Sequence, residues 1–87
     1  MSYTLTFTNT FRKGYKKLPA KIQAKTQTVI RLMSENPFHP ELQFKKMVNT
    51  PNIYELRLDR SFRLTYTASD QTVLLRVIGS HDVLKKP

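Results

Sequence analysis

The chain has 87 residues, with 15 Lys or Arg against 6 Asp or Glu, so its formal net charge is +9. This length fits one small domain, and we expect a single domain over residues 1–87. The charge predicts an anionic partner, with a basic surface that serves only solubility as the alternative. The lack of cysteine excludes a disulfide framework, a thiolate metal site and a cysteine nucleophile.

Apolar runs in the sequence are too short to cross a membrane, which takes ~20 residues. Residues 1–7 lack the basic stretch followed by an apolar stretch that is typical of a signal peptide. We therefore expect a cytoplasmic protein that has no membrane partner.

The first half of the chain predicts one strand followed by two helices. Residues 2–7 alternate apolar and hydroxyl side chains, which is typical of a half-buried strand. Thr8 follows directly as a candidate cap for a short helix with one apolar face. Pro19 can serve in the first turn of a second helix, which Pro37 ends because a proline restricts the residue before it.

The second half predicts three strands after a connection rich in proline. Residues 37–52 hold at most one short strand, around residues 44–48. Residues 54–58 and 62–68 alternate, whereas residues 72–78 are largely apolar on both faces, as in a central strand. The order β-α-α-β-β-β predicts the α+β class: an antiparallel sheet with an N-terminal helical hairpin packed on one face.

The apolar pattern predicts how the first of these hairpins pairs, because a slip of one residue would turn apolar side chains to the wrong face. Pairing Leu58 with Phe62 leaves residues 59–61 as the turn and sets Arg57 directly opposite Arg63. Two facing arginines repel each other unless an anion lies between them or both side chains extend into water.

The next hairpin is expected to turn at residues 70–71. This turn would give three apolar pairs: Ala68 with Val73, Tyr66 with Leu75, and Leu64 with Val77. On the other face, Arg76 would lie opposite Thr65, and Ile78 opposite Arg63.

This register gathers cationic side chains at one end of the sheet. Arg57, Arg63, Arg76 and His81 are expected on one face or at its rim, unless a bulge near Gly79 redirects His81. Because arginine suits bidentate recognition of phosphate, the cluster predicts a phosphate site. A solvated sheet face is the alternative.

Four short segments, in this order, carry a resemblance to a known family. They are KKLP, YELR, FRLTY and IGSH, at residues 16–19, 54–57, 62–66 and 78–81. Together they resemble the RelE/ParE superfamily of bacterial toxins, and the ending at residues 79–84 is similar to the YafQ branch.

The resemblance implies the toxin of a type II toxin–antitoxin system, with a RelE-like fold. Such a toxin would be a ribosome-dependent mRNA endonuclease that inhibits translation and uses no metal or other cofactor. Its partners would be an acidic antitoxin, the ribosome and mRNA. Two alternatives are a ParE-like inhibitor of DNA gyrase and an inactive RNA-binding relative, because one fold can serve several functions.

The resemblance also assigns roles to individual residues. Arg63 matches the arginine that contacts the scissile phosphate, Arg57 matches a basic residue of the preceding strand, and His81 matches the general acid or base. Glu41 lies near the carboxylate base of the YoeB branch. Glu55, which occupies a place where RelE has lysine, is the other carboxylate that could serve as the base. The family often has an aromatic residue after the catalytic position, whereas none follows His81 here.

These residue types suit RNA cleavage by the adjacent 2′-OH, which needs a base, cations at the phosphate and an acid. Histidine can fill either proton-transfer role, and arginine stays charged beside the phosphate. Further cations that could bind RNA phosphates, or simply face solvent, are Lys45, Lys46, Arg60 and Arg76.

Overall fold

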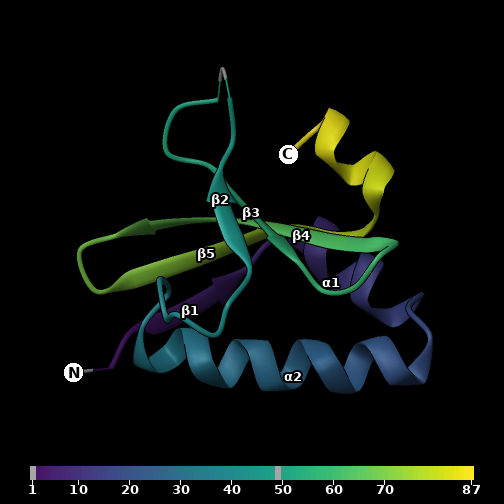
Figure 1. Cartoon of the computed structure of the whole chain (residues 1–87), viewed down its shortest axis with the longest axis horizontal. Helices are drawn as coiled ribbons and strands as arrows, with labels where there is room; N and C mark the ends of the chain where they lie inside the picture. Colours follow the sequence, from purple (N-terminus) through teal and green to yellow (C-terminus); the bar gives the residue numbers. More distant parts are fainter. Residues whose placement is uncertain (1, 49) are drawn as a thin grey trace.

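The computed structural model describes residues 2–48 and 50–87, and its elements follow the predicted order (Figure 1). They are β1 (Thr4–Phe7), α1 (Asn9–Lys16), α2 (Ala20–Glu35), β2 (Phe44–Lys46), β3 (Tyr54–Arg57), β4 (Phe62–Ser69), β5 (Thr72–Ser80) and the 3-10 helix η1 (His81–Lys85). The α+β class is confirmed, and the last element is a short 3-10 helix. In the described part of the chain, no helix is long and apolar enough to span a bilayer.

The strands form one five-stranded sheet in the order β1-β5-β4-β3-β2. Figure 1 shows α1 and α2 beneath one face of this sheet and η1, in yellow, above the other. The sheet is antiparallel except at its β1 edge, where β1 pairs parallel to β5. The expectation of a wholly antiparallel sheet is therefore wrong at this edge, since apolar alternation predicts a strand but not its neighbour.

The helical hairpin begins and ends at the residues that the sequence marks. The Thr8 hydroxyl accepts a hydrogen bond from the Phe11 N–H at 3.0 Å and so caps α1. Pro19 directly precedes α2, which ends before Pro37. The hairpin lies very close to β5, because a Cβ atom on Gly14 would collide with the backbone of that strand.

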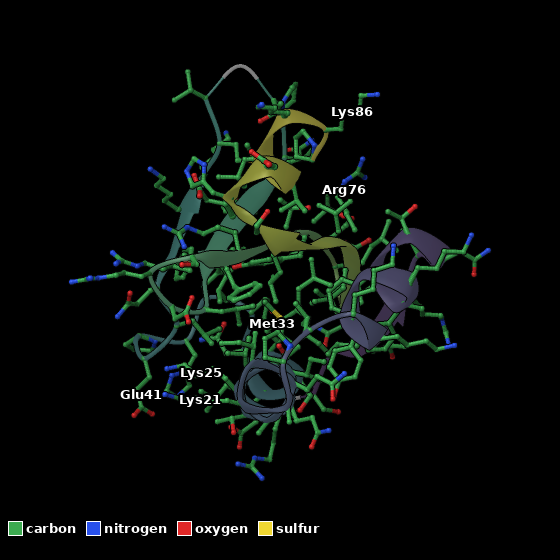
Figure 2. The ribbon with its side chains drawn as sticks, turned by 90° about the vertical axis from the view of Figure 1, so that its right-hand side faces the viewer. Lys21, Lys25, Met33, Glu41, Arg76 and Lys86 are labelled. Atoms are coloured by element: carbon green, nitrogen blue, oxygen red, sulfur yellow. The ribbon has the colours of Figure 1, made fainter. Side chains whose placement is uncertain are left out.

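The core lies between the two helices and the sheet. Met33 of α2 points toward the sheet (Figure 2) and is fully buried, as are Leu64, Tyr66 and Leu75. The Tyr66 hydroxyl donates to the carbonyl oxygen of Pro37 at 2.8 Å. Burial raises the pKa of Tyr66, because the phenolate would lose its hydration.

The predicted register of the β3–β4 hairpin is confirmed. Arg57 lies directly opposite Arg63, and Glu55 lies opposite Thr65. The N–H of Leu58 donates to the Phe62 carbonyl at 3.0 Å, which closes the hairpin where the sequence predicts the turn. The alternation of apolar residues was enough to predict this register, because both strands keep the alternation without interruption.

The predicted register of the β4–β5 hairpin is right near its turn and wrong farther along. Ala68 pairs with Val73 and Tyr66 with Leu75, as expected. The expected pair of Leu64 with Val77 does not form, because a β-bulge adds one residue to β5. Leu64 pairs instead with Ile78, whose side chain is 3% exposed and belongs to the core.

Arg76 is the added residue of this bulge, so it does not lie opposite Thr65, and Ile78 does not lie opposite Arg63. The observed partners of the two β4 residues are Val77 for Thr65 and Gly79 for Arg63. The Thr8 hydroxyl donates to the Arg76 carbonyl oxygen at 2.5 Å, which gives that carbonyl a partner where the ladder is disrupted.

Candidate nucleic-acid interface

A groove of about 360 Å³ lies on the sheet face that the helical hairpin does not cover, beside the start of η1. Because side chains alternate along a strand, burial of Leu56 and Leu64 sends their neighbours to this outer face. The groove is lined by Gln43, Phe44, Lys45, Glu55, Arg57, Arg63 and His81. The structure thus brings together five of the residues that the sequence singled out, namely Lys45, Glu55, Arg57, Arg63 and His81.

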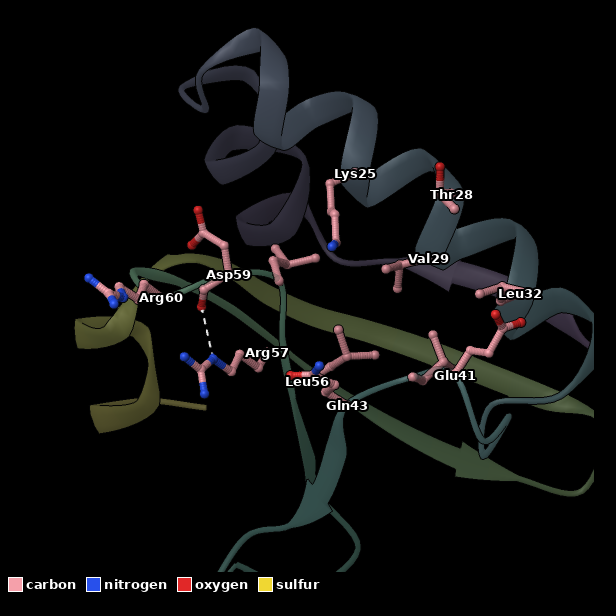
Figure 3. Close-up of a pocket in the computed structure, with 12 residues that line it drawn as sticks. Lys25, Thr28, Val29, Leu32, Glu41, Gln43, Leu56, Arg57, Asp59 and Arg60 are labelled. Atoms are coloured by element: carbon pink, nitrogen blue, oxygen red, sulfur yellow. Dashed lines mark hydrogen bonds between the residues drawn. The ribbon is translucent and has the colours of Figure 1, made fainter.

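The two facing arginines both bend toward the β3–β4 turn. Nη1 of Arg63 donates to the carbonyl oxygen of Asp59 at 2.6 Å. Nε of Arg57 donates to the same oxygen at 3.3 Å, drawn as the dashed line in Figure 3. Within the described residues, no carboxylate forms an ion pair with either arginine. Their positive charges therefore remain available to an anion.

The turn that holds these arginines is itself closed by hydrogen bonds. Oδ1 of Asp59 accepts from the main-chain N–H groups of Ser61 and Phe62, both at 2.8 Å. The bonds from Ser61 and Phe62 favour the charged carboxylate and lower the pKa of Asp59, with a smaller contribution from the charge of Arg63. Arg63 also donates to the carbonyls of Arg60 at 3.3 Å and Phe62 at 3.0 Å.

His81 is tied to the same turn through its main chain. Its N–H donates to the carbonyl oxygen of Ser61 at 3.1 Å, which fixes the start of η1 beside the arginines. Gly79 lets η1 fold back over β5, since a Cβ atom there would lie only 2.8 Å from Val83. The bulge lies at Arg76 rather than near Gly79, and His81 remains exposed at the groove.

The two candidate carboxylates occupy different places. Glu55 lines the groove, where its side chain is 13% exposed and lies 3.5 Å from the Lys45 ammonium group. Glu41 lies outside the groove, on the loop after α2, with its side chain 76% exposed and 3.9 Å from the His39 ring. It lines a separate cavity of about 550 Å³ (Figure 3). The geometry therefore offers Glu55, and not Glu41, as the carboxylate of the groove.

The four additional cations are spread over the surface. Lys45 lines the groove, and Arg60 is exposed on the adjoining turn. Lys46 is exposed on β2 and borders a different hollow. Arg76 lies apart from the groove, near the C-terminal segment (Figure 2), because its Nε donates to the main-chain oxygen of Pro87 at 2.8 Å.

The sequence did not predict that Gln43 and Phe44 line the groove, or that the Asp59 carbonyl oxygen accepts from both arginines. Gln43 extends the pairing of β2 with β3, since its carbonyl accepts the Arg57 N–H at 2.9 Å. Phe44 belongs to the short β2 strand and lines the groove with it. The sequence places Phe44 at the start of a short strand but does not mark either residue as part of the groove. Asp59 carries a usable signal, because aspartate in a turn commonly accepts from N–H groups two or three residues ahead.

Two guanidinium groups and one imidazole around a single groove can bind a phosphate and exchange a proton with atoms beside it. The carboxylate of Glu55 adds an acceptor on the same face. Across residues 2–48 and 50–87, no three His, Cys, Asp or Glu side chains gather closely enough to hold a metal ion.

No family model and no curated protein matches the sequence. Solved structures match it over nearly its whole length. A chain of the E. coli DinJ–YafQ toxin–antitoxin complex gives a TM-score of 0.80 at 13% identity, with 97% of this chain and 98% of that chain covered. The YoeB dimer from Staphylococcus aureus gives 0.79 at 20% identity, with 93% and 99% covered. A chain of the Mycobacterium tuberculosis RelBE2 complex gives 0.76 at 25% identity, with 93% and 100% covered.

The chain has the RelE fold. Among the matched structures this fold occurs in toxins that were crystallised with their antitoxins, RelE and YafQ among them. The expected resemblance to RelE, YafQ and YoeB toxins is confirmed at the level of structure. At such low sequence identity, the likeness to RelE establishes the fold alone. The roles of individual side chains are therefore inferred from the geometry of the groove.

Proposed function

We propose that residues 1–87 form one RelE-like toxin domain of a type II toxin–antitoxin system, and that it is a ribosome-dependent endoribonuclease that cleaves mRNA and inhibits translation. The observation that carries this proposal is the meeting of Arg57, Arg63 and His81 at one groove. The net charge of +9 suits a ribosomal and RNA target, and the RelE fold supports the toxin class.

In the proposed reaction, the 2′ oxygen of a ribose forms a bond to the adjacent phosphorus, and the bond from phosphorus to the 5′ oxygen breaks. The products are a 2′,3′-cyclic phosphate and a 5′-hydroxyl group. Arg57 and Arg63 bind the phosphate oxygens and stabilise the negative charge that builds up on them. His81 donates a proton to the leaving 5′ oxygen, and Glu55 accepts the proton of the 2′-OH.

The proposed partners follow from the same charge distribution. Lys45, Lys46 and Arg60 would contact phosphates of mRNA or ribosomal RNA around the groove. A cognate antitoxin with acidic segments would neutralise the protein, because complementary charge speeds and orients association. Matched toxins were crystallised with antitoxins, which supports a partner of this kind.

Primer extension on ribosomes that carry a defined mRNA tests this proposal directly. The protein should produce new 5′ ends in the ribosomal A site, and His81→Ala should slow cleavage by about 10²- to 10⁴-fold while ribosome binding persists. His39→Ala is the matched control, because His39 lies outside the groove and should leave cleavage unchanged.

Absence of cleavage on every programmed ribosome, or full activity of His81→Ala, would count against the nuclease. A supercoiling assay with DNA gyrase then separates the ParE-like alternative, which predicts inhibition, from an inactive RNA-binding relative, which does not.

A further inference from the structure

We propose that Asp59 is a positioning residue of the groove: its carboxylate fixes the β3–β4 turn so that carbonyl oxygens of the turn hold the guanidinium groups of Arg57 and Arg63. The inference deepens the proposed function and rests on it in one respect, namely that these two arginines bind an RNA phosphate.

The Asp59 side chain closes the β3–β4 turn. Its Oδ1 atom accepts from the N–H groups of Ser61 and Phe62, both at 2.8 Å. The main chain adds a bond from the Leu58 N–H to the Phe62 carbonyl at 3.0 Å. A carboxylate that accepts from two successive N–H groups restricts the conformation of the turn between them.

The closed turn points its carbonyls at the arginines. The carbonyl oxygen of Asp59 accepts from Arg63 at 2.6 Å and from Arg57 at 3.3 Å. Each guanidinium group has five N–H donors in a planar fork. The bonds to Asp59 use Nη1 of Arg63 and Nε of Arg57, which leaves donors of both groups for a phosphate.

These shared hydrogen bonds offset a repulsion between the two arginines. Arg57 and Arg63 face each other across the strand pair, where like charges push side chains apart. A shared acceptor draws both groups to one point before any anion arrives. Holding charged groups in place in advance is what makes an anion site effective, because no reorganisation is then needed on binding.

The negative charge of Asp59 offers a competing explanation, since it could attract the arginines without positioning them. In the structure the carboxylate contacts N–H groups of the turn, and the carbonyl contacts the arginines. Asp59→Asn removes the charge and keeps an oxygen acceptor of the same length. Asp59→Glu keeps the charge and moves the acceptor by one methylene. The two variants therefore separate geometry from charge.

The first readout is the ¹⁵N–¹H signal of the Arg57 Nε–H group in the full chain, which does not depend on RNA cleavage. Wild type and Asp59→Asn should show a shifted, slowly exchanging signal, whereas in Asp59→Glu and Asp59→Ala the signal should merge with those of exposed arginines. Asp70→Ala is the matched control, because Asp70 lies in the β4–β5 turn at a φ of 53°, away from both arginines. It should weaken its own hairpin and leave the Arg57 signal in place.

The second readout is kcat/KM for mRNA cleavage on ribosomes. Asp59→Glu and Asp59→Ala should lose on the order of 10²-fold, because small displacements of catalytic groups are costly, whereas Asp59→Asn should stay near wild type. The inference is overturned if the Arg57 signal is unchanged in Asp59→Glu, or if Asp59→Asn loses it. Should wild type fail to cleave RNA, the nuclease proposal fails, and the Arg57 signal still decides the role of Asp59.

Discussion

Arg57 and Arg63 lie directly opposite each other on β3 and β4, and both donate to the carbonyl oxygen of Asp59. Sheets usually avoid like charges at opposed positions, since such pairs lower stability. The protein keeps this pair at the centre of its groove. Stability and anion binding therefore make opposite demands on these two positions, and substitutions there should separate them.

Replacing Arg57 with threonine should raise stability and weaken mRNA cleavage. Arg57→Thr removes the repulsion, so the free energy of unfolding in urea should increase by about 0.2–1 kcal/mol. mRNA cleavage should fall on the order of 10²-fold, because a donor to the phosphate is lost. Arg31→Ala on the exposed face of α2 is the control for net charge and should change stability by less than ~0.5 kcal/mol. A less stable Arg57→Thr would show that the facing pair does not strain the sheet.

The two candidate bases can be distinguished by removing one charge at a time. Glu55→Gln should lower kcat by about 10²- to 10⁴-fold, because Glu55 is the carboxylate that lines the groove. Glu41→Gln keeps the same shape in a side chain outside the groove and should cleave at the wild-type rate. Single-turnover cleavage on ribosomes measures both. Equal activity of the two variants would exclude Glu55 as the base.

Acid should remove the contribution of Asp59 to stability. Hydrogen bonds from Ser61 and Phe62 lower the pKa of Asp59, helped by the nearby charges of Arg63 and Lys21. A group whose pKa is lower in the folded state stabilises above its unfolded pKa, and this gain disappears as pH falls through the folded pKa. Urea unfolding of wild type and Asp59→Asn from about pH 6 to about pH 2 should therefore converge toward low pH. A constant difference would contradict this assignment.

Tyr66 should be sensitive to loss of its hydroxyl group. Tyr66→Phe leaves the buried carbonyl of Pro37 without its 2.8 Å donor, so the free energy of unfolding should fall by about 1–3 kcal/mol. Tyr15→Phe is the control, because the Tyr15 hydroxyl accepts from Gln27 at an exposed position and donates to the Gln23 carbonyl only at a long 3.5 Å. Similar losses in both variants would mean that burial does not set the cost.

Gly14 should not tolerate even a methyl group. Alanine normally favours helices, yet a Cβ atom at this position would collide with the Ile78 carbonyl oxygen. Gly14→Ala should therefore lower the free energy of unfolding by about 1–3 kcal/mol through forced movement of α1 away from β5. Ser34→Ala, on the last turn of α2, adds no atom because serine already has a Cβ, and it removes only an exposed hydrogen bond to the Arg31 carbonyl, so it should cost less. Thermal unfolding of both variants provides the comparison.

Much of the fold was predictable from local patterns. Uninterrupted alternation in β3 and β4 was enough to place Arg57 opposite Arg63, because only one register buries the apolar side chains of both strands. Thr8 predicted the start of α1, because its hydroxyl can cap a helix. These features depend on residues that are close in sequence or on one clear apolar face.

The failures share a different origin, because each depends on contacts between distant parts of the chain. The bulge at Arg76 is supported by Thr8, which lies 68 residues away in sequence. The parallel pairing of β1 with β5 depends on how the helical hairpin returns the chain. The position of Glu41 depends on the path of a loop, and the hydrogen bonds that hold the two arginines depend on main-chain carbonyls that no side-chain pattern reveals.

The bulge also has a consequence for the groove. One added residue changes which side chains of β5 point up and which point down from that position onward. If Arg76 paired with Thr65 in a regular ladder, Ile78 would turn outward and Gly79 inward, and the chain would leave the sheet on the helix side. With it, Gly79 faces Arg63 and η1 starts above the groove. The extra residue thus shifts the alternation of the strand by one, and the histidine five residues later owes its side of the sheet to the bulge.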